Sequence, residues 1–314
     1  MPAALTRRHF LRTTAALSAA AALAPRQLFA QQADMVAQSR AAAAKVPIKT
    51  TKLYDNVFLL QGAGGNMALQ TGSEGKILID SSFSTAAPAI LQAISKAAEG
   101  PAYTLINTHW HYDHTDGNEA IHAAGYKILA HENTRTRLST PQTIKAFGLS
   151  LPAAPAGALP TATFGSTFHL HKNGDTLDLV HFDPAHTDTD IYIHFQKADV
   201  LHVGDTFFNG FYPFIDESSG GNINGMIQAN QKALALAGSG TKIIPGHGPL
   251  GDKAALQSFH DMLSSIRDKV AALKSQGLTE KEAAAKKPTA EFDATWGKGM
   301  IGPDFFVGLV YRTV

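Results

Sequence analysis

The sequence predicts an α/β fold in which a plan of strands followed by helices occurs twice. Short apolar runs rich in β-formers alternate with helical stretches in the first half, and the second half repeats this order. Residues of metal-binding type stand directly after several of the strand-like runs. At 314 residues, the chain is long enough to bury one core of moderate size.

The first half predicts three strands, a helix and a fourth, buried strand. Glycine-rich turns at residues 62–65 and 72–75 separate the first three strands. The strands are expected over residues 53–61, 66–71, 76–80 and 102–107, with the helix over 86–98. Further on, helices are expected over residues 118–124 and 131–138, on either side of a strand over 127–130.

The second half predicts the same kinds of element. Strands lie between residues 170 and 204, and they are followed by a helix over 224–237, a strand over 242–245 and a long helix over 253–276. A short helix is expected over residues 279–286, because Thr279 and Glu282 have the spacing of a capping box. The aromatic tail, residues 290–314, is expected to pack on the core, with a homodimer contact as the alternative.

The most informative segment is Thr108 to His114, where four potential metal ligands fall within six positions. They are His109, His111, Asp113 and His114, and they follow the buried strand directly. Imidazole and carboxylate are ligands that suit Zn²⁺. Alternating side chains on such a loop can direct His109 and His111 to one ion and the other two residues to a second.

Three more ligand candidates stand where strand-like runs end. They are His186, Asp205 and His247, the last flanked by glycines that let the backbone turn. His181 and His194 lie near His186 but inside strand-like runs, so His186 is preferred. Most of the fourteen histidines are expected to be ordinary surface or core residues.

Over residues 46–250 the chain resembles the metallo-β-lactamase-fold hydrolase superfamily, whose pattern is His-x-His-x-Asp-His followed by a His, an Asp and a His. The resemblance implies that His109, His111 and His186 hold one metal, that Asp113, His114 and His247 hold the other, and that Asp205 bridges them. With the two βα halves, it implies a four-layered αββα sandwich. The bridging aspartate points to glyoxalase II-like and lactonase-like members.

The resemblance implies a dinuclear zinc hydrolase with two Zn²⁺, iron or manganese being alternative metals. A hydroxide shared by two zinc ions is available at neutral pH, because the pKa of the bound water falls from about 15.7 to roughly 7. It would attack the carbonyl of an ester, lactone, thioester, amide or β-lactam in a small molecule, with Asp113 orienting it and later carrying a proton. The alternatives are an iron-dependent oxidoreductase of the same fold and a non-catalytic accessory protein.

Weaker features bear on the substrate pocket. Phe207, Phe208 and Tyr212 follow Asp205 closely and are expected to form an apolar wall. Trp110 lies between two ligands and is expected to line the pocket, with packing beneath it as the alternative. Residues 139–160 are long for a connection and rich in proline. This segment is either a lid over the site or a surface loop.

The N-terminus predicts an export signal. Residues 6–12 hold a pair of arginines followed by Phe-Leu, and an alanine-rich stretch comes next, so the segment resembles a bacterial twin-arginine signal. Cleavage after Ala30 would place the protein in the periplasm without a membrane anchor. Residues 31–45 would then be a linker or short helix, and residues 46–314 the hydrolase domain with a C-terminal helical tail.

Composition restricts the partners and the chemistry. There are no cysteines, which excludes disulfides, a thiolate ligand and a cysteine nucleophile. The net charge is +1, and losing the four arginines of the signal would make it −3. Neither net charge predicts a nucleic-acid partner, because proteins that bind nucleic acids usually have a basic face.

Overall fold

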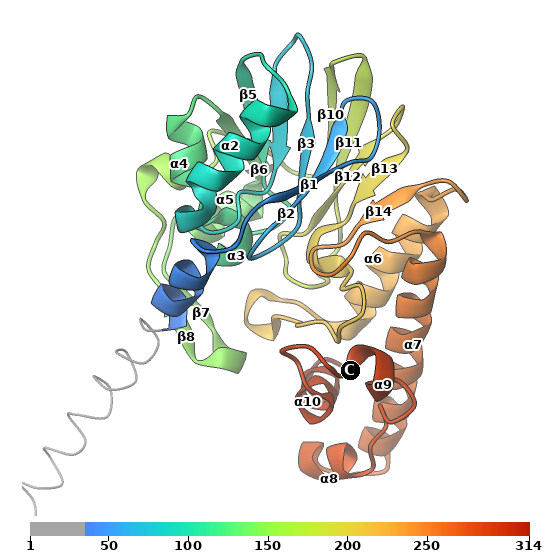
Figure 1. The fold of residues 1–314 in the computed structure, drawn as a ribbon. Coiled ribbons are helices and arrows are strands. Elements are labelled where there is room, and N and C mark those ends of the chain that lie inside the picture. Colours follow the sequence, from blue (N-terminus) through green and yellow to red (C-terminus); the bar gives the residue numbers. More distant parts are fainter. Residues whose placement is uncertain (1–34) are drawn as a thin grey trace, which may run out of the picture.

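Two β-sheets packed face to face form the centre of the protein (Figure 1). The computed structural model describes residues 35–314, so the expected export signal over residues 1–30 lies outside the described residues. The first sheet has the strand order β1-β2-β3-β4-β5-β6-β9, and the second has the order β10-β11-β12-β13-β14. Helices cover the outer face of each sheet, which confirms the αββα sandwich.

The first sheet is antiparallel from β1 to β4 and parallel from β4 onward. Its strands are β1 (Lys49–Lys52), β2 (Val57–Gln61), β3 (Met67–Gln70), β4 (Lys76–Ile79), β5 (Ala102–Ile106), β6 (Lys127–His131) and β9 (Ala162–Phe164). The strand expected over residues 53–61 is shorter than predicted, because the backbone NH groups of Leu53 and Tyr54 both donate to the carbonyl of Val57 and close a turn. The edge strand β1 was not expected.

The second sheet is antiparallel except for its last pair, β13 with β14. Its strands are β10 (Thr167–Lys172), β11 (Asp175–His181), β12 (Ile191–Phe195), β13 (Val200–His202) and β14 (Lys242–Ile244). Between the sheets, apolar side chains from alternate strand positions interlock, among them Leu59 and Ile79 of the first sheet and Leu179 and Ile193 of the second.

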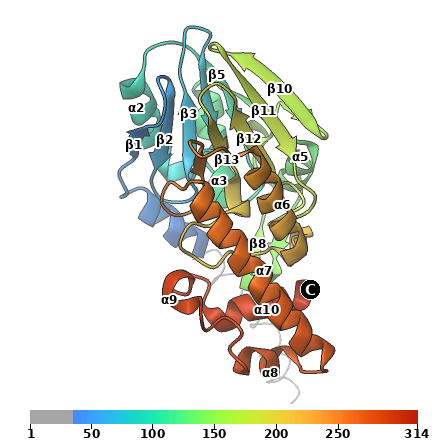
Figure 2. The ribbon, with the colours of Figure 1, turned by 90° about the vertical axis from the view of Figure 1, so that its right-hand side faces the viewer.

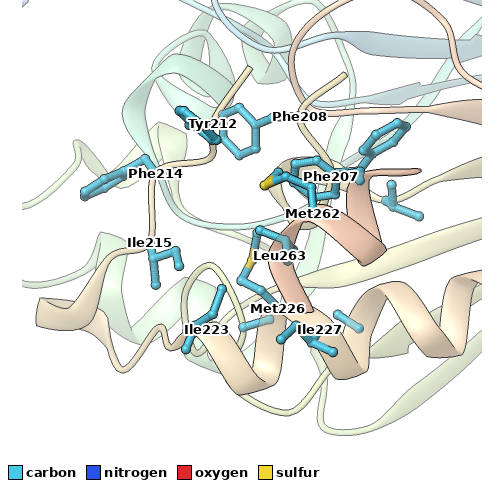
Figure 3. Packing of buried hydrophobic residues seen from close by; sticks show 14 of the residues in the cluster. Phe207, Phe208, Tyr212, Phe214, Ile215, Ile223, Met226, Ile227, Met262 and Leu263 are labelled. Carbon is cyan, nitrogen blue, oxygen red and sulfur yellow. The ribbon is translucent and has the colours of Figure 1, made fainter. Parts of the chain in front are cut away.

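Helices enclose the two sheets on the outside. On the first sheet lie α2 (Ala87–Ala97), which was expected over 86–98, and α4 (Asn118–Ala123). On the second lie α6 (Ile223–Leu236) and α7 (Lys253–Ser275), whose buried faces meet a large apolar cluster (Figure 3). Among the described residues, no helix combines the length and the apolar character needed to cross a membrane.

The C-terminal tail turns back as helices below the sandwich (Figure 2). They are α8 (Glu280–Ala285), α9 (Asp293–Trp296) and α10 (Pro303–Thr313). The predicted capping box of Thr279 and Glu282 is present at the start of α8. The ring of Phe306 stacks on Tyr212 at 4.8 Å, so the tail packs on the segment that follows Asp205.

Within residues 139–160, residues 142–151 fold into a small hairpin, and the remainder is irregular apart from a 3₁₀ turn at Ala156–Ala158. The strands β7 (Gln142–Ile144) and β8 (Leu149–Leu151) pair across a short 3₁₀ turn at Lys145–Phe147. A helix over residues 35–43 lies on the same side of the molecule (Figure 1). Both elements stand beside the edge at which the expected ligands meet.

Candidate metal centre

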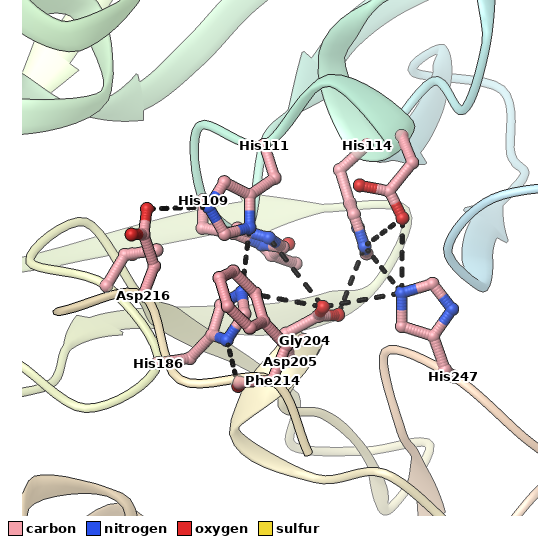
Figure 4. Close-up of polar contacts among 12 residues, drawn as sticks. His109, His111, His114, His186, Gly204, Asp205, Phe214, Asp216 and His247 are labelled. Atoms are coloured by element: carbon pink, nitrogen blue, oxygen red, sulfur yellow. Dashed lines mark hydrogen bonds and ion pairs between the residues drawn. The ribbon is translucent and has the colours of Figure 1, made fainter. Parts of the chain in front are cut away.

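The seven expected ligands come together in two adjoining groups (Figure 4). The donor atoms of the first group lie within 4.8 Å of one another, and those of the second group do as well. The first group is His109, His111, His186 and Asp205, and the second is Asp113, His114 and His247. Asp205 joins them, since its carboxylate also lies 3.0 Å from Nε2 of His114 and 3.3 Å from Nε2 of His247.

Every ligand comes from the end of a strand at one edge of the sandwich. His109 and His111 follow β5, and Asp113 and His114 lie in the short helix α3 (Tyr112–Thr115) after them. The other three follow β11, β13 and β14 in the second sheet, at His186, Asp205 and His247. His181 and His194 stay within β11 and β12, as expected.

In the first group, each imidazole has one ring nitrogen bound to a neighbour and the other turned toward the group. Nδ1 of His109 lies 3.0 Å from Oγ1 of Thr108, and Nδ1 of His186 lies 2.8 Å from the carbonyl of Phe214. His111 is turned the other way, with Nε2 at 3.1 Å from the carboxylate of Asp216. Such outer contacts fix the orientation of metal-binding histidines.

In the second group, Asp80 fixes the orientation of His114 in the same way. Its Oδ2 lies 2.8 Å from Nδ1 of His114, which leaves Nε2 of that ring facing Asp205. Nε2 of His247 lies 3.2 Å from Oδ2 of Asp113. Two carboxylates and two imidazoles therefore converge on one point.

The residues fit a pair of divalent metal ions. Nε2 of His109 is buried without a hydrogen-bond partner, and Oδ1 of Asp205 is not aligned for a hydrogen bond. Nδ1 of His111 and Nε2 of His186 point at each other 2.8 Å apart. Buried polar atoms are almost always paired, so these inward-facing donors fit a bound cation. Nitrogen and oxygen donors of these types suit zinc, and also iron and manganese.

Burial and mutual charge shift the pKa values in opposite directions within the centre. Burial lowers the pKa of His109, and it lowers the pKa of His186 to about 4 with help from nearby His111. For His247, burial also lowers the pKa, but the carboxylates of Asp205 and Asp113 outweigh it and raise the pKa to about 10. Burial raises the pKa of Asp205, yet His247 and its neighbours hold it well below the ordinary value. The second group thus concentrates negative charge that a metal would neutralise.

Two glycines let the backbone approach the ligands closely. A Cβ on Gly65 would lie 2.0 Å from the ring of His114, and a Cβ on Gly246 would lie 1.8 Å from Oδ1 of Asp205. Neither space admits a side chain. The Gly246 loop is also held in place by Asn66, whose side-chain amide donates to the carbonyls of Pro245 and Gly248.

Sequence reasoning missed Asp80, Asp216 and Asn66. Asp80 was recognised only as the end of a strand. Its neighbouring parallel strand ends at the ligands, which was a usable signal, because carboxyl ends of parallel strands meet at one edge. Asp216 lies in an irregular segment, where only the fold brings it to His111.

A cavity of about 410 Å³ opens over the ligands. Phe208 and Tyr212 line it, whereas Trp110 and Phe207 do not, which corrects the expectation for those two. The chain at Phe207 is extended, so the side chains of Phe207 and Phe208 point to different sides (Figure 3). Phe207 packs on Phe259 of α7 instead, with ring centroids 5.2 Å apart. Trp110 is buried in the core, where its ring packs against that of His111 with centroids 4.7 Å apart.

Comparison with known proteins agrees with this geometry. Residues 60–247, more than half of the chain, match the model of the Metallo-beta-lactamase superfamily. Hydroxyacylglutathione hydrolases are similar in sequence. The one from Polaromonas sp. is 30% identical over 146 residues, 46% of this chain and 47% of that protein. The one from Rhodospirillum rubrum is 29% identical over 164 residues, 51% and 55% of the two chains. The chain spans about half the length of these curated relatives.

Solved structures show the same fold at low sequence identity. A metallo-beta-lactamase from Pontibacter korlensis has a TM-score of 0.58 at 18% identity, over 69% of this chain and 99% of that one. A sec-alkylsulfatase from Pseudomonas sp. has a TM-score of 0.64 at 18% identity, over 84% of this chain and 50% of that one. With the family match and the two groups of ligands, these likenesses lead to one conclusion: the chain belongs to the metallo-β-lactamase superfamily.

Proposed function

We propose that the protein is a dinuclear metal-dependent hydrolase that cleaves an acyl bond of a small molecule by adding water to its carbonyl carbon. The observation that carries the proposal is the meeting of two groups of nitrogen and oxygen donors at Asp205, under an open cavity. The bond is that of an ester, lactone, thioester or β-lactam. The similarity to hydroxyacylglutathione hydrolases supports this range and favours no single member of it.

When bound, two divalent ions supply Lewis acidity for the carbonyl and a nucleophilic hydroxide at neutral pH. The protein holds the side chains that would bind these ions in position. The histidines of the first group are fixed by Thr108, Phe214 and Asp216, so they need no rearrangement to hold an ion. Asp205 spans both groups and sets the spacing between them.

Asp113 is the proposed proton carrier. Its side chain is about one-fifth exposed, and it lines the cavity. Burial raises the pKa of its carboxyl, but His114 and His247 outweigh this and lower it to about 2. The carboxylate of Asp113 is therefore ionised in the metal-free protein. In the metal-loaded protein, its place at the cavity would let it orient the attacking water and carry a proton to the leaving group.

Metal analysis combined with substrate assays tests the proposal. The protein is purified, its metals are measured, and the same sample is assayed with an ester, a lactone, a thioester and a chromogenic β-lactam. We expect about two zinc ions per chain, turnover of at least one substrate, and loss of that turnover on chelation with recovery on adding Zn²⁺. Iron as the bound metal, or two bound metals without any turnover, would favour the oxidoreductase or accessory alternative.

We also propose that residues 1–30 direct export to the periplasm by the twin-arginine route. The support is the order of the paired arginines, Phe10-Leu11 and the alanine-rich stretch. Replacing Arg7 and Arg8 by lysine in the full chain is expected to keep the protein in the cytoplasm on cell fractionation. Unchanged export of this variant would contradict the proposal.

A further inference from the structure

We propose that the cavity over the metal centre selects a neutral substrate with an apolar group, such as an ester or lactone with a hydrocarbon chain. A substrate held by its own carboxylate would be disfavoured. This inference rests on the proposed hydrolase function and names the substrate class for the same site. In the reaction, the acyl C–O bond breaks, water supplies the new C–O bond, and the products are a carboxylate, an alcohol and a proton.

The lining of the cavity away from the ligands is almost entirely apolar. It is contributed by the helix over residues 35–43, the β7–β8 hairpin, the segment after Asp205, and the loop between α9 and α10. The apolar side chains include Ile144, Phe147, Leu149, Phe208, Phe214 and Ile301. Because four segments distant in the sequence all present apolar atoms to the same space, this character belongs to the cavity as a whole.

The aromatic rings of this wall support one another. Phe147 packs against Phe214 with ring centroids 4.7 Å apart, and against Phe305 of α10 at 5.9 Å. Phe208 stacks on the imidazole of His247 at 5.2 Å. Contacts of this kind hold each ring in place, so the wall is formed before a substrate enters.

No lysine or arginine lies among the described residues that line the cavity. Arg40 and Arg137 instead border a separate, smaller cavity, and they are already paired with Asp116 and Asp188, respectively. The hydroxyl of Tyr212 already donates to Asp293. A carboxylate on the distal part of a substrate would thus lose its water without gaining a counter-ion, which disfavours its binding.

The rim of the cavity is also apolar. Met300 is 82% exposed at the mouth of the cavity, the largest exposure among the big apolar side chains of the described residues. Methionine is flexible and adapts to apolar ligands of different shapes. An exposed methionine beside the entrance is therefore suited to close over a hydrocarbon group.

A series of nitrophenyl esters on the zinc-loaded protein tests the inference. One series runs from acetate to octanoate, and the other has chains of matched length that end in a carboxylate. We expect kcat/KM to rise about threefold to fourfold for each added methylene until the cavity is filled. Each carboxylate-bearing ester should fall about 100-fold below its neutral counterpart.

Variants of the cavity wall test whether it causes the dependence on chain length and the penalty on the carboxylate esters. Phe147→Ala should flatten the dependence on chain length, and Phe147→Arg should reduce the penalty on the carboxylate esters by at least about tenfold. The control is Phe168→Ala, since Phe168 is an exposed phenylalanine on β10 that does not line the cavity. It should leave both series unchanged, and thermal melting should show that all three variants are folded.

The outcomes separate this inference from the proposed function. Turnover of both series without dependence on chain length, or with the carboxylate series preferred, would overturn the inference and leave the hydrolase intact. If no ester is hydrolysed, a binding experiment tests the inference. The neutral fluorophore N-phenyl-1-naphthylamine, bound to the zinc-loaded protein, should be displaced by methyl octanoate at concentrations at least about tenfold below those needed for methyl butanoate. Equal displacement would overturn the inference on its own.

Discussion

Asp205 is the residue on which the two ligand groups depend. Its carboxylate lies 3.5 Å from Nε2 of His186 in one group and 3.3 Å from Nε2 of His247 in the other. It is buried, and the positive charge that protonated His114 and His247 provide in the metal-free protein keeps it ionised. The residues that bind the outer ring nitrogen of each histidine matter as much, because they decide which nitrogen faces a bound metal.

Replacing Asp80 by asparagine tests whether such an outer contact matters for metal binding. Asp80 accepts from Nδ1 of His114 and from the backbone NH of Thr108, so its loss should leave His114 poorly oriented. We expect metal affinity to fall about 10- to 100-fold, with the fold retained. The measurement is competition for zinc with a coloured chelator, followed by circular dichroism.

The matched control is Asp178→Asn, because Asp178 forms an aspartate–histidine pair with His169 on an exposed strand face. That variant should bind zinc as the parent does. Equal affinities for all three proteins would show that Asp80 does not orient His114.

A methyl group at Gly246 should disrupt the centre directly. The added Cβ would lie 1.8 Å from Oδ1 of Asp205, so either the carboxylate or the loop that holds His247 must move. We expect Gly246→Ala to bind less than half of the metal bound by the parent, as measured by elemental analysis. Gly302→Ala is the control, since nothing lies within 4 Å of its Cβ position. Full metal content in Gly246→Ala would contradict the close approach.

At the scale of elements, the segment after β13 connects the metal centre to both the core and the tail. Phe208 forms a β-bridge with His247, and Phe207 packs into the cluster beneath α7. Tyr212 is held by the stacked ring of Phe306 on α10 and by Asp293 of α9. The C-terminal helices therefore support the cavity wall without contributing a ligand.

The capping box of α8 allows the stability of this tail to be changed without touching the centre. Thr279→Ala removes the side chain that accepts from the backbone NH of Glu282. The expected loss is about 1 kcal/mol in the free energy of unfolding, with unchanged metal content. Urea denaturation measures it. Ser275→Ala, in an exposed last turn of α7, is the control and should cost less than half as much. Equal losses would mean that the cap contributes nothing specific.

At the scale of the whole molecule, the sandwich buries a carboxyl group that does not bind metal. Asp190 is 2% exposed and accepts from the backbone NH and hydroxyl of Thr187. Burial raises its pKa to about 7, although these hydrogen bonds act in the opposite direction. The folded protein thus retains a proton on Asp190 at a pH where the unfolded chain, with an ordinary aspartate pKa, has lost it.

The sign of the resulting pH dependence follows from this difference. The contribution to stability is complete below the unfolded pKa of about 4 and is lost as the pH rises to about 7, at up to about 1.4 kcal/mol per pH unit. Asp190→Asn should remove this slope from the free energy of unfolding, measured by denaturant titration of metal-free protein between pH 4 and 7. Parallel curves for variant and parent would contradict the raised pKa.

Much of the arrangement could be predicted from local patterns. The strands that end at ligands, the helix α2 and the capping box all lie close to their expected positions, because apolar periodicity and turn residues act over a few neighbours. The boundaries were less accurate around residues 53–56, where a backbone turn interrupts an apolar run. The hairpin β7–β8 was not anticipated either.

The sequence by itself determined which seven residues are the candidate ligands, since residues of metal-binding type at the ends of strand-like runs form a local pattern that also carries the family resemblance. Only the tertiary structure decided what surrounds them. Asp216 reaches His111 from 105 residues away, and Phe207 and Phe208 differ in role although they are adjacent. The physical reason is that the direction of a side chain, and the partners it meets, depend on contacts between elements distant in the chain, which no short window of sequence contains.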